Sequence, residues 1–333
     1  MMTEKIRVVL TTPVEEATLQ KIGAVSERLK VDPLSPLILA ERKGDLSRKA
    51  ELDGLFGEAE VVYGWIHHFP HNLLSRAPRL RWIQTMSAGV DRLPPEIMGS
   101  GVRIVNASGL HGTPMAEVVL QMMLMFAKDA PSCFRMKEKK EWKRYTPVLL
   151  KGQTAGVLGL GVVGKEIARL CKAFGMTVWG IHRSPREGES YPCVDRLFSR
   201  EQLPQFLAAV DFAVIATPLT RETKGMMGEK ELKSMKPTAF LINVARGAIV
   251  NETELIRALE EKRIAGAGLD VFVDEPLPPA SRFYELPNVI FSPHISGEMP
   301  AYEMRATEVF CENLRRYLKG EPFLHEVDKT KGY

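Results

Sequence analysis

The chain has 333 residues, of which 45% are hydrophobic and 26% charged, a balance that is typical of a globular protein and excludes a disordered or coiled-coil chain. Its net charge of +4 is too small an excess to indicate a nucleic-acid partner. The longest apolar stretch falls well short of the roughly 20 residues that cross a bilayer, and the four cysteines form no CxxC pair, so we expect a cytoplasmic protein without a membrane segment or a thiolate metal site.

The first hundred residues alternate short apolar runs with segments of helical spacing. This alternation is typical of an α/β fold, in which helices connect parallel strands. The expected strands cover residues 6–12, 60–63, 81–84 and 103–105, and a helix is expected over residues 15–29. The pattern predicts an α/β unit that is less regular than the second half of the chain.

The segment HHFPH at residues 67–71 contains three histidines. Three imidazoles so close together suggest a metal cluster, but Pro70 prevents the regular helix that would align them, so we predict no metal here. One alternative is a loop that lines the substrate site, where Trp65 and Phe69 accept an apolar or aromatic side chain of the substrate. The other is an ordinary, partly exposed loop.

A very apolar helix is predicted over residues 114–126. A helix that is apolar nearly all round must be covered on most faces, so we predict a central packing helix. The alternative is a helix that is shared with a partner subunit. The charge run at residues 135–144, RMKEKKEWKR, is typical of a solvated helical face.

From residue 150 onward the alternation becomes regular. The expected strands cover residues 155–159, 176–181, 212–217, 239–244, 265–271 and 289–292, and the expected helices cover residues 162–174, 201–209, 229–235 and 252–261. These strands are continuously apolar, as they are when helices cover both faces of a parallel sheet. Six such strands predict a doubly wound sheet of the Rossmann type.

A glycine-rich sequence, GLGVVG, stands between the first of these strands and its helix. It consists of Gly159, Leu160, Gly161, Val162, Val163 and Gly164. The first glycine permits a tight turn, the second lets the backbone approach a pyrophosphate, and the third lets the helix pack closely on the strand. The N–H groups and the dipole of the helix N-terminus favour an anion there. The segment therefore predicts a dinucleotide site.

The residues at the end of the next expected strand indicate which dinucleotide the site prefers. An NAD site usually has Asp or Glu about 20 residues beyond the first glycine, but this chain has His182, Arg183 and Ser184 there. Arginine pairs with a 2′-phosphate, which a carboxylate would repel. We therefore predict a preference for NADP(H). The alternative is that Arg183 is only a solvated loop residue and that NAD(H) binds without its usual acidic partner.

Three polar residues follow late strands of this half: Arg246, Glu275 and His294. Open α/β sheets bind ligands at the carboxyl ends of their strands. Reduction of a 2-keto acid needs a cation for the carboxylate and a proton donor for the carbonyl oxygen. Arg246 fits the first requirement and His294 the second, while Glu275 would orient the imidazole and favour its charged form.

An ordered series of motifs resembles the D-2-hydroxyacid dehydrogenase family. The matching segments are LKGQTAGVLGLGVVG at 150–164, ATPLTRET at 216–223, LINVARGAIV at 241–250, GAGLDVFVDEPLP at 266–278, NVIFSPHISG at 288–297, and the earlier SAGVD at 87–91 and NASG at 106–109. The substitution at residues 182–184 is similar to the NADP-preferring branch that includes glyoxylate and hydroxypyruvate reductases.

The resemblance implies a Rossmann domain inserted into a second, flavodoxin-like α/β substrate domain. The substrate domain would comprise residues 1–104 and 296–333, and the dinucleotide-binding domain residues 105–295. Members of the family commonly form homodimers through the cofactor domain, which would cover the apolar helix at residues 114–126.

The resemblance also implies roles for individual residues. Arg246 would bind the substrate, Glu275 would be the partner of the histidine, and His294 would be the acid and base. The loop at Ala88 and Gly89 would offer backbone N–H groups to the substrate carboxylate. The positions that would line the adenosine and nicotinamide parts of the cofactor site are Thr217, Pro218, Asn243, Ala245 and Asp270.

The leading hypothesis is therefore an oxidoreductase that transfers a hydride between NADP(H) and a 2-keto acid/D-2-hydroxy acid pair, with a glyoxylate- or hydroxypyruvate-like substrate. One rival is a dinucleotide-sensing protein with little turnover, as in the corepressor relatives of the family, which can keep the same three residues. A second rival is an enzyme of the same fold with an unusual donor such as phosphite.

Overall fold

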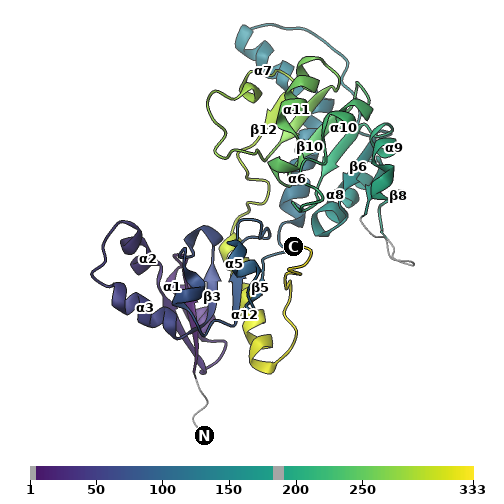
Figure 1. The fold of residues 1–333 in the computed structure, drawn as a ribbon. Helices are drawn as coiled ribbons and strands as arrows, with labels where there is room; N and C mark the ends of the chain where they lie inside the picture. The colour runs from purple at the N-terminus through teal and green to yellow at the C-terminus, as the bar shows by residue number, and fades with distance from the viewer. Residues whose placement is uncertain (1–4, 183–190) are drawn as a thin grey trace. The chain divides into compact units, whose positions relative to one another are not determined.

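The computed structural model describes residues 5–182 and 191–333 and divides the chain into two compact units (Figure 1). Unit 1 consists of Met1–Leu110 and Pro300–Tyr333, and unit 2 consists of His111–Met299. Both ends of the chain therefore belong to unit 1, and the sequence of unit 2 is inserted between them.

Unit 1 is built on a five-stranded, entirely parallel sheet with the order β2-β1-β3-β4-β5. Its strands are β1 (Ile6–Leu10), β2 (Leu29–Pro33), β3 (Ala59–Gly64), β4 (Trp82–Thr85) and β5 (Arg103–Val105). This order is that of flavodoxin-like folds. The predicted flavodoxin-like α/β fold is confirmed, and β2 is an edge strand that the sequence pattern did not indicate.

The helices of unit 1 come from both ends of the chain. They are α1 (Glu16–Gly23), α2 (Ser35–Arg42), α3 (Lys49–Gly57), the short turn η1 (Ile66–His68), α4 (Leu73–Arg76), α5 (Pro95–Met98) and α12 (Tyr302–Lys319). The prediction of one helix over residues 15–29 is wrong beyond Gly23, because the chain turns there and enters β2. Helix α12 packs on the sheet through Phe310, whose ring stacks on Tyr63 of β3 at 4.1 Å.

Unit 2 contains a seven-stranded parallel sheet with the order β12-β11-β10-β9-β6-β7-β8. Its strands are β6 (Thr154–Leu158), β7 (Thr177–Ile181), β8 (Arg196–Phe198), β9 (Phe212–Ile215), β10 (Phe240–Asn243), β11 (Gly266–Leu269) and β12 (Val289–Phe291). The order is the doubly wound Rossmann order with one further strand. The predicted Rossmann sheet is confirmed, and the strand missing from the prediction, β8, has only three residues, two of them exposed.

Helices cover both faces of this sheet. They are α6 (Gly112–Ala127), α7 (Ala130–Lys139), α8 (Val162–Ala173), η2 (Arg200–Gln202), α9 (Leu203–Leu207), α10 (Glu229–Ser234), η3 (Gly247–Ile249), α11 (Glu252–Glu260) and η4 (Arg282–Tyr284). One apolar core lies under α6 and α8, and the other lies under α9, α10 and α11. The apolar helix α6 contributes buried side chains to the first core, as predicted for a packing helix, whereas its contact with a partner subunit stays a prediction.

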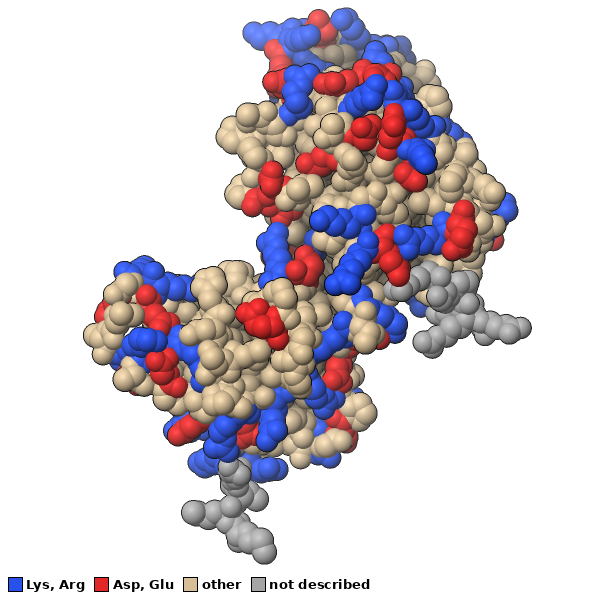
Figure 2. All heavy atoms as spheres, in the orientation of Figure 1, with Lys and Arg blue, Asp and Glu red and all other residues tan. Residues whose placement is uncertain are grey.

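The predicted helical face over residues 135–144 is only partly helical, because α7 ends at Lys139 and the residues after it run on without helix or strand. On the face that Figure 2 shows, Lys and Arg gather around α7 at the top of the view and elsewhere alternate with Asp and Glu. Among the described residues, the helices are all too short or too polar to reach across a bilayer.

Candidate active site

The glycine-rich loop joins β6 to α8 in the way that a dinucleotide requires. Gly159 has a φ of 100°, and a Cβ on it would lie 2.9 Å from the carbonyl oxygen of Ala216. A Cβ on Gly164 would collide with the carbonyl of Gly159, so the helix packs against the turn itself. In contrast, nothing lies within 4 Å of the corresponding position on Gly161. The loop is thus tight where the chain turns and open where a pyrophosphate approaches the N-terminus of α8.

The neighbouring residues of this loop have different surroundings. The side chain of Leu160 is buried and packs against Gly180 of β7, so only its backbone is placed to meet a ligand. Val162 is 52% exposed at the start of α8, and Val163 packs partly into the core. The Cα of Thr217 lies beside Gly159, which places the loop after β9, with Pro218, next to the glycine turn.

The carboxyl end of β7 carries the predicted determinant for the adenosine ribose. His182 follows Ile181, the last residue of that strand, and its ring lies 5.3 Å from Tyr191. Arg183 and Ser184, the other two predicted residues, lie outside the described residues. The nearby Asp195 binds the N–H of Val178 at 2.7 Å, toward the amino end of the same strand. Its carboxylate is therefore at the wrong end of β7 to take the usual place of the NAD-binding acid.

Arg246 is presented by a turn that follows β10. The Asn243 side chain closes this turn, because its amide donates to the carbonyl of Arg246 at 2.9 Å and its oxygen accepts the N–H of Ala245 at 3.1 Å. The guanidinium donates to the carbonyl of Ala245 at 2.7 Å and is half-buried. Asn243 and Ala245, which were predicted to line the cofactor site, thus also shape the backbone that holds Arg246.

Glu275 and His294 form a direct pair. The imidazole Nδ1 of His294 lies 2.8 Å from Oε2 of Glu275, and Oε1 of the same carboxylate accepts the N–H of Phe272 at 3.1 Å. Gly247, the residue after Arg246, packs directly on the backbone of Phe272. The structure therefore brings together the three predicted residues on adjacent loops at the carboxyl ends of β10, β11 and β12. Because Glu275 engages Nδ1, Nε2 is the ring nitrogen of His294 that this carboxylate does not hold.

The loop that carries His294 is held by a fully buried carboxylate. His294 has a φ of 56°, a left-handed conformation that costs free energy for a residue other than glycine. Asp270, which is 0% exposed, accepts the Ser292 hydroxyl at 2.6 Å and the N–H groups of Ile295 and Ser296 at 2.9 and 3.0 Å. Asp270 binds the histidine loop through its carboxylate, and its predicted place in the cofactor site stays a prediction.

A second histidine of unit 2 was missed by the sequence analysis. His111 caps the N-terminus of α6, and a Cβ on Gly297 would lie 2.9 Å from its ring. Burial, together with the charge of Arg246, lowers the pKa of His111 to about 4. The imidazole is therefore neutral near pH 7 and lies close to both the arginine and the histidine loop. A histidine directly before the apolar helix was the available signal in the sequence.

In unit 1, the predicted substrate loop follows β4. Two of its carbonyls are hydrogen-bonded: that of Ala88 accepts from the side chain of Asn106 at 2.8 Å, and that of Gly89 accepts from the hydroxyl of Ser87 at 2.8 Å. The backbone N–H groups of residues 87–90 donate to no acceptor among the described parts of the chain. Consecutive N–H groups left in this way form a small anion-binding surface.

The HHFPH segment forms a well-held loop at the end of β3. Arg42 donates to the carbonyls of His67 and Phe69 at 2.9 and 3.0 Å. Phe69 is only 6% exposed and belongs to the core of unit 1, which does not favour the alternative in which it accepts a substrate side chain. Trp65 stacks on Tyr302 at 5.5 Å. Within residues 5–182 and 191–333, no three His, Cys, Asp or Glu side chains are grouped to hold a metal ion.

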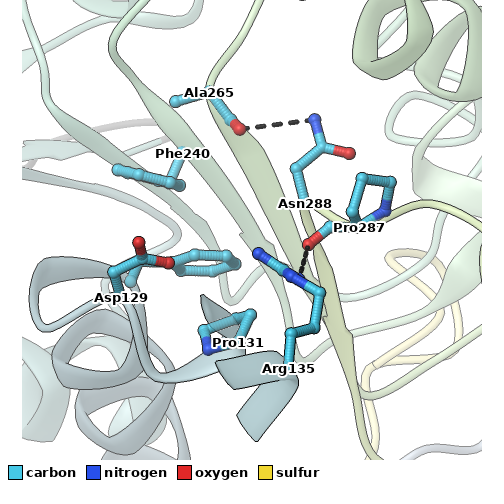
Figure 3. Close-up of a pocket in the computed structure, with 8 residues that line it drawn as sticks. Asp129, Pro131, Arg135, Phe240, Ala265, Pro287 and Asn288 are labelled. Atoms are coloured by element: carbon cyan, nitrogen blue, oxygen red, sulfur yellow. Dashed lines mark hydrogen bonds between the residues drawn. The ribbon is translucent and has the colours of Figure 1, made fainter. Parts of the chain in front are cut away.

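A cavity of about 300 Å³ in unit 2 lies away from these residues (Figure 3). It is lined by Phe126, Asp129, Pro131, Arg135, Phe240, Ala265, Pro287 and Asn288. Phe240 begins β10, while Ala265 and Asn288 directly precede β11 and β12. The cavity therefore opens at the amino ends of the strands, opposite the edge that carries Arg246, and Arg135 is tied to the carbonyl of Pro287 at 3.2 Å beside it.

Comparisons with known proteins agree with this arrangement. Residues 120–296 match the family described as D-isomer specific 2-hydroxyacid dehydrogenase, NAD binding domain. A glyoxylate reductase of Thermococcus gammatolerans is 35% identical over 259 residues, which cover 75% of this chain and 76% of the relative.

Two solved structures resemble the whole chain. A D-isomer specific 2-hydroxyacid dehydrogenase of Xanthobacter autotrophicus Py2, in complex with NADPH and MES, has a TM-score of 0.82 and 29% identity and covers 99% of this chain and 100% of its own. An NADPH-dependent glyoxylate/hydroxypyruvate reductase of Sinorhizobium meliloti, in complex with NADP and sulfate, has a TM-score of 0.81 and 27% identity over the same shares of the two chains.

Proposed function

This chain belongs to the D-isomer specific 2-hydroxyacid dehydrogenase family and is an NAD(P)-dependent 2-hydroxyacid dehydrogenase, and from that premise we propose that it reduces a small 2-keto acid to the D-2-hydroxy acid with NADPH. Glyoxylate and hydroxypyruvate are the favoured substrates. The relatives named glyoxylate reductase, and the NADP-bound reductase of Sinorhizobium meliloti, support this choice.

The observation that carries the reaction class is the contact of 2.8 Å between His294 Nδ1 and Glu275 Oε2. The carboxylate orients the ring through this contact. Nε2 then donates a proton to the carbonyl oxygen of the keto acid during reduction and accepts it during oxidation. When bound, the nicotinamide cofactor supplies or takes up the hydride.

Two groups are suited to the carboxylate and the carbonyl of the substrate. The half-buried guanidinium of Arg246 is planar and can hold a carboxylate by two hydrogen bonds or polarise a carbonyl oxygen. The N–H groups at Ala88 and Gly89 are suited to the substrate carboxylate, since the carbonyl between them, that of Ala88, is held by Asn106.

The proposed preference for NADP(H) is argued from the residues that follow β7. His182 stands directly after the strand, Arg183 follows it in the sequence, and Asp195 is bound near the amino end of the strand. An arginine at this position favours the 2′-phosphate, and the sequence has no acid at residues 182–184, where the NAD-binding carboxylate usually stands.

A reductase screen tests the proposed function. We expect NADPH oxidation to be fastest with glyoxylate and hydroxypyruvate, slower with branched and aromatic 2-keto acids, and to give D-glycerate from hydroxypyruvate. A higher kcat/KM for an aromatic keto acid, or no turnover of any 2-keto acid, would contradict the proposal.

Cofactor preference is tested by the double variant His182→Asp and Arg183→Ala. The wild-type ratio of kcat/KM for NADPH over NADH should exceed one, and the double variant should lower it by about two powers of ten through loss of a phosphate contact and gain of a ribose acceptor. Arg169→Ala, which removes an arginine paired with Glu166 on α8, should leave the ratio unchanged. A wild-type ratio below one would end this part of the proposal.

A further inference from the structure

The carboxylate-binding loop of unit 1 depends on a buried relay of side-chain amides. We propose that Asn106 is a positioning residue that aims the N–H groups of this loop at the substrate, and that Gln84 and Asn313 hold Asn106 in place. The inference rests on the proposed function only in taking the ligand of the loop to be the carboxylate of the substrate.

Asn106 supplies a side-chain anchor from outside the loop. Its Nδ2 donates to the carbonyl of Ala88 at 2.8 Å. The carbonyl of Ser87 is held by the hydroxyl of Thr85 at 2.8 Å and by the N–H of Ala107 at 3.1 Å, the residue after Asn106. The segment that begins at Asn106 therefore sets the orientation of two successive peptide groups of the loop.

Peptide geometry converts this anchor into an orientation of N–H groups. In a planar trans peptide the C=O and the following N–H point in opposite directions. When Asn106 draws the carbonyl of Ala88 toward itself, the N–H of Gly89 is directed away from it. The same argument directs the N–H of Ala88 away from the bonds that hold the carbonyl of Ser87. Two adjacent donors are thus presented on the side of the loop opposite Asn106.

The relay behind Asn106 is buried along its length. Its backbone carbonyl accepts from Nε2 of Gln84 at 3.1 Å, and Oε1 of Gln84 accepts from Nδ2 of Asn313 on α12 at 2.9 Å. The three residues are 5%, 0% and 0% exposed. A buried amide is costly unless it is hydrogen-bonded, and Gln84 links the amide of Asn313 to the backbone of Asn106, so a change at Asn313 or Gln84 affects the position of Asn106.

The chain end is tied to the far side of this relay. Asn313 accepts the N–H of Leu324 at 2.8 Å, and its amide also donates to the Leu324 carbonyl at 3.2 Å. The next residue, His325, accepts the backbone N–H of Asn106 at 3.1 Å. The segment after α12 therefore fixes Asn106 from two directions, and α12 supports the substrate loop as well as covering the sheet.

The test compares Asn106→Ala with wild type, using glyoxylate as substrate and oxalate, an unreactive dicarboxylate, as ligand. We expect the KM for glyoxylate and the inhibition constant of oxalate to rise together by about tenfold, the effect of losing one hydrogen bond to a charged group. The kcat and the KM for NADPH should stay within about twofold, because the proton donor and the cofactor loop lie in unit 2.

Asn288→Ala is the matched control, since its amide donates to the carbonyls of Leu259 and Ala265 in unit 2 and touches no residue of the relay. It should lower the unfolding temperature without changing the constants for glyoxylate or oxalate. If Asn106→Ala does not fold, Asn313→Ser, which leaves Asn106 in place, should raise both constants by a smaller factor.

Unchanged constants in a folded Asn106 variant would overturn the proposal, as would an equal loss of NADPH binding. Calorimetric binding of oxalate to the NADPH-loaded protein separates this outcome from failure of the proposed function, because it needs no turnover. If Asn106→Ala weakens oxalate binding but the wild type reduces no 2-keto acid, the proposed function is wrong and the positioning role of Asn106 still holds.

Discussion

Two loops, one in each unit, are held by buried side chains of opposite hydrogen-bonding character. In unit 1 the amide of Asn106 donates to a loop carbonyl. In unit 2 the carboxylate of Asp270 accepts two loop N–H groups and a hydroxyl. Both loops follow the carboxyl ends of parallel strands, so their positions in the folds are alike.

The difference decides what each loop offers to a ligand. An anchor that donates hydrogen bonds occupies carbonyls of its loop, so N–H groups are available to an anion. A carboxylate anchor occupies N–H groups of its loop, so the group available to a ligand is a side chain, that of His294. Under the proposed function, the first arrangement would serve substrate binding and the second would serve proton transfer. Substitution of the anchor of the unit 1 loop should therefore change KM, and substitution of the anchor of the unit 2 loop should change kcat.

The largest effect should follow His294→Ala. Loss of the group that gives a proton to the carbonyl oxygen should lower kcat by about three powers of ten, with a small change in the KM for glyoxylate. Steady-state kinetics with NADPH measure both. His71→Ala, which removes an exposed histidine of unit 1, is the control. A variant of His294 that keeps a tenth of the wild-type kcat would remove the proton-transfer role from unit 2.

A smaller effect is expected from Asp270→Asn. The substituted amide would set its own N–H groups against those of Ile295 or Ser296, so His294 would lose its orientation toward the substrate. We expect kcat to fall by about two powers of ten and the inhibition constant of oxalate to stay within about threefold. If the oxalate constant rises and kcat does not fall, the contrast between the two anchors is wrong.

The smallest effect concerns stability and His111. Because burial and Arg246 lower its folded pKa to about 4, the unfolded chain binds a proton that the folded chain does not between pH 4 and 6.5. Stability is therefore lost as the pH falls through this range, by about 2 kcal/mol at pH 5 from this residue. Urea unfolding at pH 7 and pH 5 should show a difference for wild type that His111→Asn reduces by that amount.

His67, His68 and His325 also have lowered pKa values, for which burial is the main cause. They contribute to the pH dependence of both proteins and cancel in the comparison. If the free energy of unfolding depends on pH equally in wild type and His111→Asn, the folded chain does not hold His111 in its neutral form, and this prediction is wrong.

Much of unit 2 was predictable because its signals are local. Its buried strands read as continuous apolar runs, and the polar residues that follow them, such as Arg246 and His294, lie where such sheets bind ligands. Prediction failed where elements are short or exposed. Strand β8 offers three residues, and β2 has a partly exposed pattern that a helix would also show.

The supports of the site were harder to predict than its reactive groups. Gln84 and Asn313 look like ordinary surface residues in the sequence, yet they are hydrogen-bonded across 229 positions with no exposure. Phe69 beside three histidines read as a residue near a ligand, although it belongs to the core. A polar or aromatic residue carries no mark of its burial when its partners are far away in the chain.

By itself, the sequence determined the glycine turn, the order of the strands along the chain and the residue types at their ends, because each depends on neighbours within a few positions. Tertiary structure alone decided which side chains meet, such as Asp270 with the histidine loop and Asn106 with Ala88. The reason is that a hydrogen bond acts over about 3 Å, so its partner is chosen by the topology that brings distant strands and helices together.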